Sequence, residues 1–257
     1  MLTSDALRRP GSCDHLVQAY TSDRHLGLVV AEYVGAGLAQ GEGAVIIALP
    51  PHVRIFTERL DALGIDVAAA IVRRQFLVLD ARETLANLMV DGEPDRDRFL
   101  RMVAGALEHV RPASSGGVRL YGEMVELLWR DSVQATLTLE RLWNEVLRAE
   151  GVSLLCGYRL DGLQRGMPSL LRRITACHSH LLPAEDQPRL ELAVDRAYAE
   201  VFGSDDDAHV LRRLMVSGAD LGAAMPDAQA ALLALADMPS ALADDIHARA
   251  RRHYSRA

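Results

Sequence analysis

The chain has 257 residues, 49% of them hydrophobic and 25% charged, and carries a formal net charge of −7. This composition excludes a disordered chain and allows a sizeable core, and the negative charge argues against a protein built mainly to bind nucleic acid. No run reaches the ~20 apolar residues that a membrane-spanning helix needs, and no secretory signal is visible. The three cysteines lack the spacing of a disulfide framework and fit reduced thiols, so we expect a cytoplasmic protein with no membrane partner.

The first predicted strand and helix meet at a turn that has the position of a phosphate-binding loop but not its chemistry. Residues 1–13 show no apolar period and are expected to form a flexible leader. An apolar run at 16–20 then predicts a strand, and a helical pattern begins at Leu26. A P-loop here would carry G-x-x-x-x-G-K-[ST], whose glycine amides and lysine hold phosphates. The turn is instead polar, has a single glycine and no lysine, and contains Arg24 and His25, which favours a sensor or adaptor over a motor or kinase.

Up to Pro183 the chain alternates predicted strands and helices. A strand at 44–49 is apolar at every position, as expected where helices cover both faces of a parallel sheet. Strands that alternate with helices through short connections predict βαβ units, and hence a three-layer α/β domain with a mostly parallel sheet. Further strands are predicted at 76–79, 118–121 and 152–156, and helices at 53–63, 81–89, 96–110 and 133–149.

After Pro183 the sequence shows helical periodicity only. We therefore predict an α/β domain over residues 14–183 and an all-helical extension over 184–257. The extension can be a small separate appendage, or its helices can pack on one face of the sheet, and the sequence leaves both arrangements open. The helical runs lie at 190–201, 210–216, 228–235 and 241–254.

Several side chains follow predicted strands at their carboxyl ends, where open α/β sheets place their ligand sites. Glu123 comes directly after the fourth strand. It can face a ligand, or it can be a carboxylate favoured by the dipole of a helix that begins near Met124. We predict it as a pocket residue without a catalytic role. Asp80, which ends the third strand, is equally suited to cap the next helix. Tyr20 ends the first strand and, with Arg24, is predicted to contact the ligand.

Four further residues lie on or beside different strands and can converge in a central crevice: His15, Arg119, Cys156 and Tyr158. An imidazole, a guanidinium and a phenol would suit a polar or anionic small ligand within an apolar pocket. Other interpretations stay open, since Cys156 can be a small buried hydrophobe and His15 a hydrogen-bonded residue at a strand start.

Two groups of cysteines and histidines raise the question of zinc, Cys13-x-His15 and Cys177-His178-x-His180. Neither has the C-x₂₋₄-C spacing of a structural zinc site, so we expect no metal. No G-x-S-x-G of a serine hydrolase and no G-x-G-x-x-G after the first strand occurs, so we expect no cofactor and no catalytic residue. Basic pairs such as Arg172-Arg173 are interspersed with acids, which favours solvated helix faces over direct nucleic-acid binding.

The order of several short motifs resembles one family. These motifs are His15 and Tyr20 bounding the first strand, Gly37-Leu38-Ala39-Gln40-Gly41-Glu42, Leu79-Asp80-Ala81 with Glu83, Arg119 with Gly122-Glu123-Met124, Glu140 with Asn144, and Leu155-Cys156-Gly157-Tyr158 followed by His178 or His180. Over about residues 14–182 this order resembles the MEDS domain, the methanogen/methylotroph sensory domain, a divergent relative of the RecA/KaiC-like ATPases. The resemblance implies a RecA-like core without a working Walker A, found in bacterial and archaeal regulators beside DNA-binding or kinase modules. It also implies a role in sensing small molecules such as hydrocarbon derivatives.

We therefore predict a non-catalytic sensory protein that binds an unidentified small molecule at the carboxyl edge of its sheet. It would pass the signal to a regulatory protein partner of a transcription or kinase pathway, and a homodimer is one arrangement open to it. Two alternatives are a nucleotide-binding enzyme that uses Arg24 or Arg119 for phosphate, and an interaction scaffold without a ligand. The predicted ligand-binding residues are His15, Tyr20, Arg24, Arg119, Glu123, Cys156, Tyr158 and His178.

Overall fold

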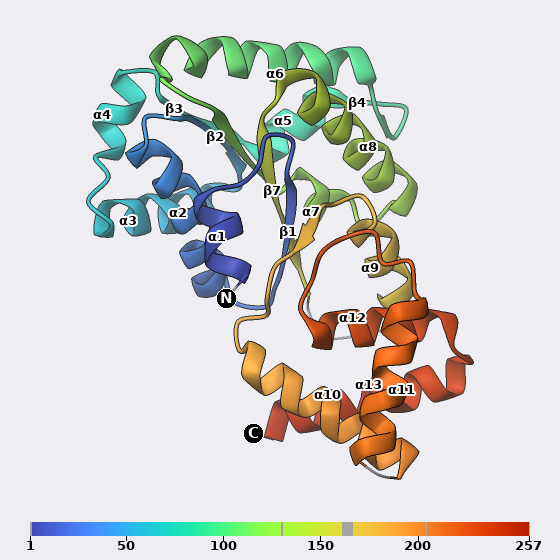
Figure 1. Ribbon diagram of the computed structural model, residues 1–257. Helices are drawn as coiled ribbons and strands as arrows, with labels where there is room; N and C mark the ends of the chain where they lie inside the picture. The colour runs from blue at the N-terminus through green and yellow to red at the C-terminus, as the bar shows by residue number, and fades with distance from the viewer. Residues whose placement is uncertain (1, 130, 161–166, 204, 257) are drawn as a thin grey trace. The chain divides into compact units, whose positions relative to one another are not determined.

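The computed structural model describes residues 2–129, 131–160, 167–203 and 205–256, and the chain divides into two compact units (Figure 1). The N-terminal unit spans Met1–Arg159, and the C-terminal unit spans Leu160–Ala257. Among the described helices, none combines the length and the apolar character needed to cross a membrane.

The N-terminal unit is built on a parallel sheet with the strand order β3-β2-β6-β7-β1. Its strand β2 is buried at every position, as the uninterrupted apolar run predicts for a strand covered on both faces. Because all five strands run in the same direction, their carboxyl ends meet at one edge. The strands are β1 (His15–Tyr20), β2 (Gly43–Ala48), β3 (Phe76–Asp80), β6 (Val118–Gly122) and β7 (Ser153–Arg159).

Helices cover both faces of this sheet. Tyr121 of β6 packs edge-on against Phe56 on one face, with 5.2 Å between the ring centroids. The next residue, Gly122, points to the opposite face, where Trp143 comes within 3.9 Å of the position of a Cβ. The helices of this unit are α1 (Leu2–Arg8), α2 (Asp23–Ala39), α3 (Pro50–Ala62), α4 (Val67–Val72), α5 (Ala81–Leu88), α6 (Arg96–Val110), α7 (Met124–Leu128) and α8 (Val133–Glu150), with a short turn η1 (Arg111–Ala113) and a hairpin of β4 (Met89–Val90) and β5 (Glu93–Pro94).

Helix α8 has clear signals at both ends. The Ser132 side chain accepts a hydrogen bond from the backbone N–H of Ala135, and Gly151 ends the helix with a φ of 64°. These ends set the helical register of Glu140 and Asn144, which are four residues apart and therefore share one face of the helix.

Residues 2–8, expected within a flexible leader, form helix α1 instead. Leu7 is buried, and the guanidinium of Arg119 donates hydrogen bonds to the carbonyl oxygens of Leu7 and Arg8. Because Arg119 is more than a hundred positions away in sequence, the local sequence pattern of residues 1–13 could not predict these contacts.

The C-terminal unit is mainly helical and has a core of its own. Tyr198 is buried in that core, and its hydroxyl donates a hydrogen bond to the carbonyl oxygen of Ala231. The unit contains α9 (Met167–Thr175), β8 (His180–Leu181), α10 (Gln187–Phe202), α11 (Asp205–Gly218), α12 (Asp227–Ala234), η2 (Leu235–Asp237) and α13 (Ser240–Arg256). The predicted α/β class, with a parallel sheet flanked by helices and a helical C-terminal region, is confirmed.

Candidate functional site

Glu123 lies at the carboxyl edge of the sheet and is the centre of a buried hydrogen-bond network. Its side chain is 1% exposed. One carboxylate oxygen accepts the backbone N–H of Leu49, and the other accepts His52 Nδ1 at 2.5 Å and the Tyr121 hydroxyl at 3.2 Å. Glu123 precedes α7 but makes no side-chain cap to it, so its role is to bind α3 rather than to cap the next helix. Asp80, by contrast, does cap α5, since it accepts the backbone N–H groups of Arg82 and Glu83.

His52 lies between two carboxylates. Its Nε2 atom is 3.4 Å from Asp23 Oδ1, on the side opposite Glu123. Burial alone would lower the pKa of His52, but the hydrogen bond and charge of Glu123, with a smaller contribution from Asp23, raise it above its ordinary value. His52 therefore links the buried Glu123 to the more exposed Asp23, and the two carboxylates favour its protonated form.

The outer end of this network reaches solvent. Arg159 Nη1 donates to Asp23 Oδ1 at 2.5 Å, and the two side chains are 34% and 42% exposed. The Arg159 guanidinium also lies 5.7 Å from the centre of the Tyr20 ring. Burial, followed by the charge of Glu123, raises the pKa of the Tyr20 phenol, which therefore stays neutral. We call Tyr20, Asp23, His52, Glu123 and Arg159 the carboxyl-edge cluster. Arg24 is an exposed residue in the first turn of α2, next to Asp23.

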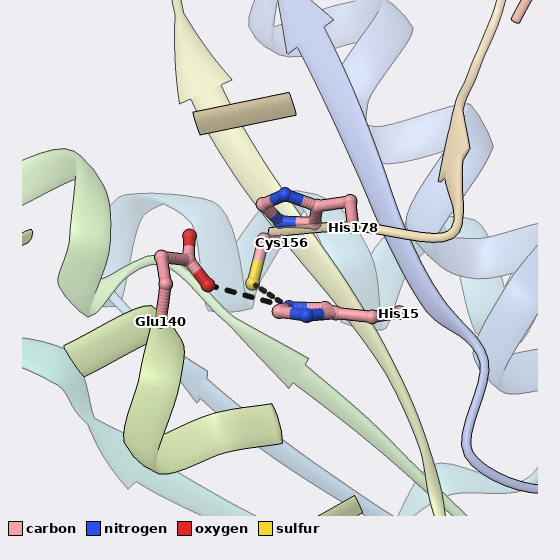
Figure 2. A group of neighbouring side chains, drawn as sticks. All are labelled: His15, Glu140, Cys156 and His178. Atoms are coloured by element: carbon pink, nitrogen blue, oxygen red, sulfur yellow. Dashed lines mark hydrogen bonds and ion pairs between the residues drawn. The ribbon is translucent and has the colours of Figure 1, made fainter. Parts of the chain in front are cut away.

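A second polar group lies between the sheet and α8. Figure 2 shows His15 of β1, Glu140 of α8 and Cys156 of β7 pointing toward one another. The Nε2 atom of His15 is 3.4 Å from Cys156 Sγ and 3.4 Å from Glu140 Oε2, and the donor atoms of all three lie within 4.8 Å of one another. All three side chains are buried. We call these residues the inner cluster.

Neighbouring side chains orient the inner cluster. His15 Nδ1 donates to Asn144 Oδ1 at 3.1 Å, which fixes the ring orientation and directs Nε2 toward Cys156 and Glu140. The Tyr158 hydroxyl donates to Glu140 Oε1 at 2.5 Å. Burial raises the pKa of Glu140 to about 8, although the hydrogen bond from Tyr158 opposes this shift.

Arg119 lies away from both clusters, near the amino end of β6. Its five N–H donors are all used, by both carboxylate oxygens of Glu42 and by the carbonyl oxygens of Leu7, Arg8 and Tyr33. Arg119 therefore joins α1, α2 and the start of β2 together, and it does not converge with His15, Cys156 and Tyr158.

His178 belongs to the C-terminal unit, where its Nδ1 donates to the carbonyl oxygen of Ile174 at 2.8 Å. Cys13 is exposed while His15 is buried, and Cys13 is not in the cluster of candidate metal ligands found among the described residues. The cysteine next to His15 is therefore Cys156, on the neighbouring strand, and not Cys13, which is close to it in sequence.

Several residues of these networks were not predicted. Glu140 and Asn144 stood among the family motifs but were assigned no role. His52 follows Pro50-Pro51 directly after β2, and Asp23 follows β1, so the carboxyl-end rule that selected Glu123 would also have selected both.

Comparisons with known proteins add a family and a structural likeness. The model of the family described as the methanogen/methylotroph, DcmR sensory domain (MEDS) matches residues 14–179, well over half of the chain. Among solved structures, the chain is similar to a KaiC-like protein from the hyperthermophilic archaeon Pyrococcus horikoshii, with 14% identity, a TM-score of 0.46, and coverage of 67% of this chain and 73% of that chain. No curated protein matches the sequence.

Proposed function

Because the chain belongs to the MEDS sensory-domain family, we propose that it is a non-catalytic sensor whose N-terminal unit binds a small ligand at the carboxyl edge of the sheet. The observation that supports this site is the carboxyl-edge cluster, in which a buried Glu123–His52 pair continues into the partly exposed Asp23–Arg159 pair. Such edges are where open α/β sheets bind ligands.

The chemistry at the start of α2 favours a ligand other than a nucleotide. The sequence contains no lysine at all, so the lysine of a P-loop is absent from it. Ser22 caps α2 by accepting the backbone N–H of His25, and Asp23 places a carboxylate in the first turn. A phosphate at this helix end would meet the Asp23 carboxylate instead of free amides.

The same network offers a route from ligand to structure. A small molecule with an anionic or polar group can compete with Asp23 for the Arg159 guanidinium. Loss of that pair alters the charge beside His52 and, through it, the contacts of Glu123 with the first turn of α3. We propose that this change is passed to a regulatory protein of a transcription or kinase pathway, in keeping with the family's sensory role.

Native mass spectrometry of the freshly purified full chain, repeated after denaturation, tests the ligand site. We expect a small non-covalent mass that is retained by the wild type and by Arg96→Gln, a control in which an exposed Arg–Glu pair is lost, and that is absent from Arg159→Gln. Where the chain is bare, formate, acetate and propionate serve as probes in thermal unfolding. A ligand at about 100 times its Kd stabilises the folded state by about 2.7 kcal/mol.

The alternatives predict different results. A bound nucleotide would favour the nucleotide-binding enzyme, and ATP turnover abolished by Glu123→Gln would overturn the non-catalytic assignment. A bare chain that no probe stabilises would favour the interaction scaffold.

A further inference from the structure

The inner cluster brings together the three kinds of side chain that bind zinc most often. We propose that His15, Glu140 and Cys156 form a zinc site within the N-terminal unit, separate from the carboxyl-edge cluster. Thiolate sulfur, imidazole nitrogen and carboxylate oxygen are all zinc ligands, and this mixture of soft and borderline donors disfavours magnesium and calcium.

The spacing of the three donor atoms supports this assignment. Zinc bonds of about 2.3 Å to sulfur and 2.0–2.2 Å to nitrogen and oxygen, in a tetrahedron, place neighbouring donors about 3.3–3.6 Å apart. His15 Nε2 is 3.4 Å from Glu140 Oε2 and 3.4 Å from Cys156 Sγ. His15 is therefore at zinc-binding spacing from each of the other two donors, which lie within 4.8 Å of each other. The three side chains account for three positions of a tetrahedral site.

Neighbouring residues form hydrogen bonds that orient His15 and Glu140, as the hydrogen-bonding partners of metal ligands do in metal sites. Asn144 accepts the Nδ1 proton of His15, which leaves the lone pair of Nε2 directed at the other two donors. Tyr158 donates to one oxygen of Glu140 and leaves the second oxygen toward His15. Register fixes the strand contributions, because β1 and β7 pair Val17 with Cys156, which places His15 and Cys156 on the same face of the sheet.

The burial of the polar inner cluster costs free energy, and a bound metal would offset that cost. Core positions between a sheet and a helix are normally apolar, and a buried carboxylate next to an imidazole costs free energy unless it is paired or binds a metal. Without a metal, the Cys156 thiol can donate to His15 Nε2, so a purely hydrogen-bonded cluster is the alternative that the experiment must separate from the zinc site.

The test uses the full chain with Cys13→Ser and Cys177→Ser, which removes the two thiols outside the cluster and leaves Cys156 as the single cysteine. The protein is purified without chelator, its zinc is measured by elemental mass spectrometry, and the stripped protein is titrated with Co²⁺. We expect equimolar zinc, and with Co²⁺ a thiolate charge-transfer band and the visible bands of tetrahedral cobalt. In Cys156→Ser the charge-transfer band disappears.

Variants with unchanged circular dichroism keep the test independent of folding. Asn144→Ala removes only the support of His15 and is expected to weaken zinc binding by about 10–100-fold. Glu140→Gln keeps the shape of the side chain but removes a zinc ligand, and is expected to weaken zinc binding more than Asn144→Ala does. The proposal would be overturned if the folded chain with only Cys13→Ser and Cys177→Ser bound neither Zn²⁺ nor Co²⁺. It would also be overturned if Cys156→Ser and Asn144→Ala left metal binding unchanged.

Discussion

Two buried glutamates in the N-terminal unit show how neighbouring residues decide what a carboxyl group can do. Glu123 accepts hydrogen bonds from a backbone amide, from Tyr121 and from His52, whose pKa is raised by this carboxylate. Glu140 accepts one from Tyr158, and burial raises its pKa to about 8. The first therefore has several hydrogen-bond donors directed at it, whereas the burial of the second favours its neutral form unless a cation binds beside it.

The raised pKa of His52 predicts a pH-dependent contribution to stability. The folded state favours the imidazolium relative to the unfolded chain, so the contribution is complete below the unfolded pKa of about 6.5 and is lost as pH rises through the higher folded pKa. Glu123, Asp23 and Tyr20 face the ring from three other elements. We expect the stability advantage of wild type over His52→Gln, measured by urea unfolding from about pH 5.5 to about pH 9, to decrease as the pH rises.

The control for this measurement is His209→Gln, which changes an exposed histidine of α11. Its difference from wild type should vary little over the same range. A His52→Gln difference that stays constant, or that grows toward high pH, would contradict the assignment of a stabilised imidazolium.

At the scale of single elements, β7 links the two polar clusters. Cys156 and Tyr158 alternate along the strand and point toward α8, Gly157 points to the opposite face, and Arg159 ends the strand at the carboxyl edge. A Cβ on Gly157 would lie 2.8 Å from the Tyr121 hydroxyl that donates to Glu123. This glycine therefore makes room for the Tyr121 side chain, which donates a hydrogen bond to Glu123 of the carboxyl-edge cluster.

Gly157→Ala is expected to displace Tyr121 and to lower the unfolding free energy by about 1–3 kcal/mol, as overpacking of a buried site does. Urea unfolding measures the loss. Gly122→Ala on the neighbouring strand β6 is the matched control, because its nearest neighbours lie 3.9 Å from the new Cβ. Tyr121→Phe should recover part of the loss in the double variant, and a Gly157→Ala variant as stable as Gly122→Ala would disprove the clash.

The strands could be predicted from the sequence, whereas the inner cluster could not. Apolar runs and helical periods predicted the strands of the parallel sheet, because burial on both faces leaves a strong local signal, as in β2. The inner cluster joins His15, near the start of the N-terminal unit, to Glu140 and Cys156, near its end. Their meeting depends on the register of β1 against β7 and on the rotation of α8. The sequence brought Cys13 and His15 to attention only because they are two positions apart, and Cys13 lies before the strand with a φ of 74° and is exposed.

At the scale of the whole molecule, two cores divide the chain differently from the family match. The C-terminal unit begins at Leu160, whereas the family model extends to residue 179. The helical extension predicted over 184–257 lies entirely within the C-terminal unit. This unit therefore combines the last part of the family segment with helices outside it, and its own buried residues hold it together, among them Val194, Tyr198, Ala231 and Ile246.

Separate cores predict separate responses to core substitutions. Ile246 of α13 and Leu154 of β7 are both fully buried, one in each unit, and truncation of such a side chain to alanine costs about 2–5 kcal/mol. We expect Ile246→Ala to lower the hydrogen-exchange protection of α10, α12 and α13 while β2 and β6 keep theirs, and Leu154→Ala to have the reverse effect. Hydrogen-exchange mass spectrometry of the full chain measures both regions in one sample. Equal loss of protection in both units from either substitution would show that the chain unfolds as a single cooperative body.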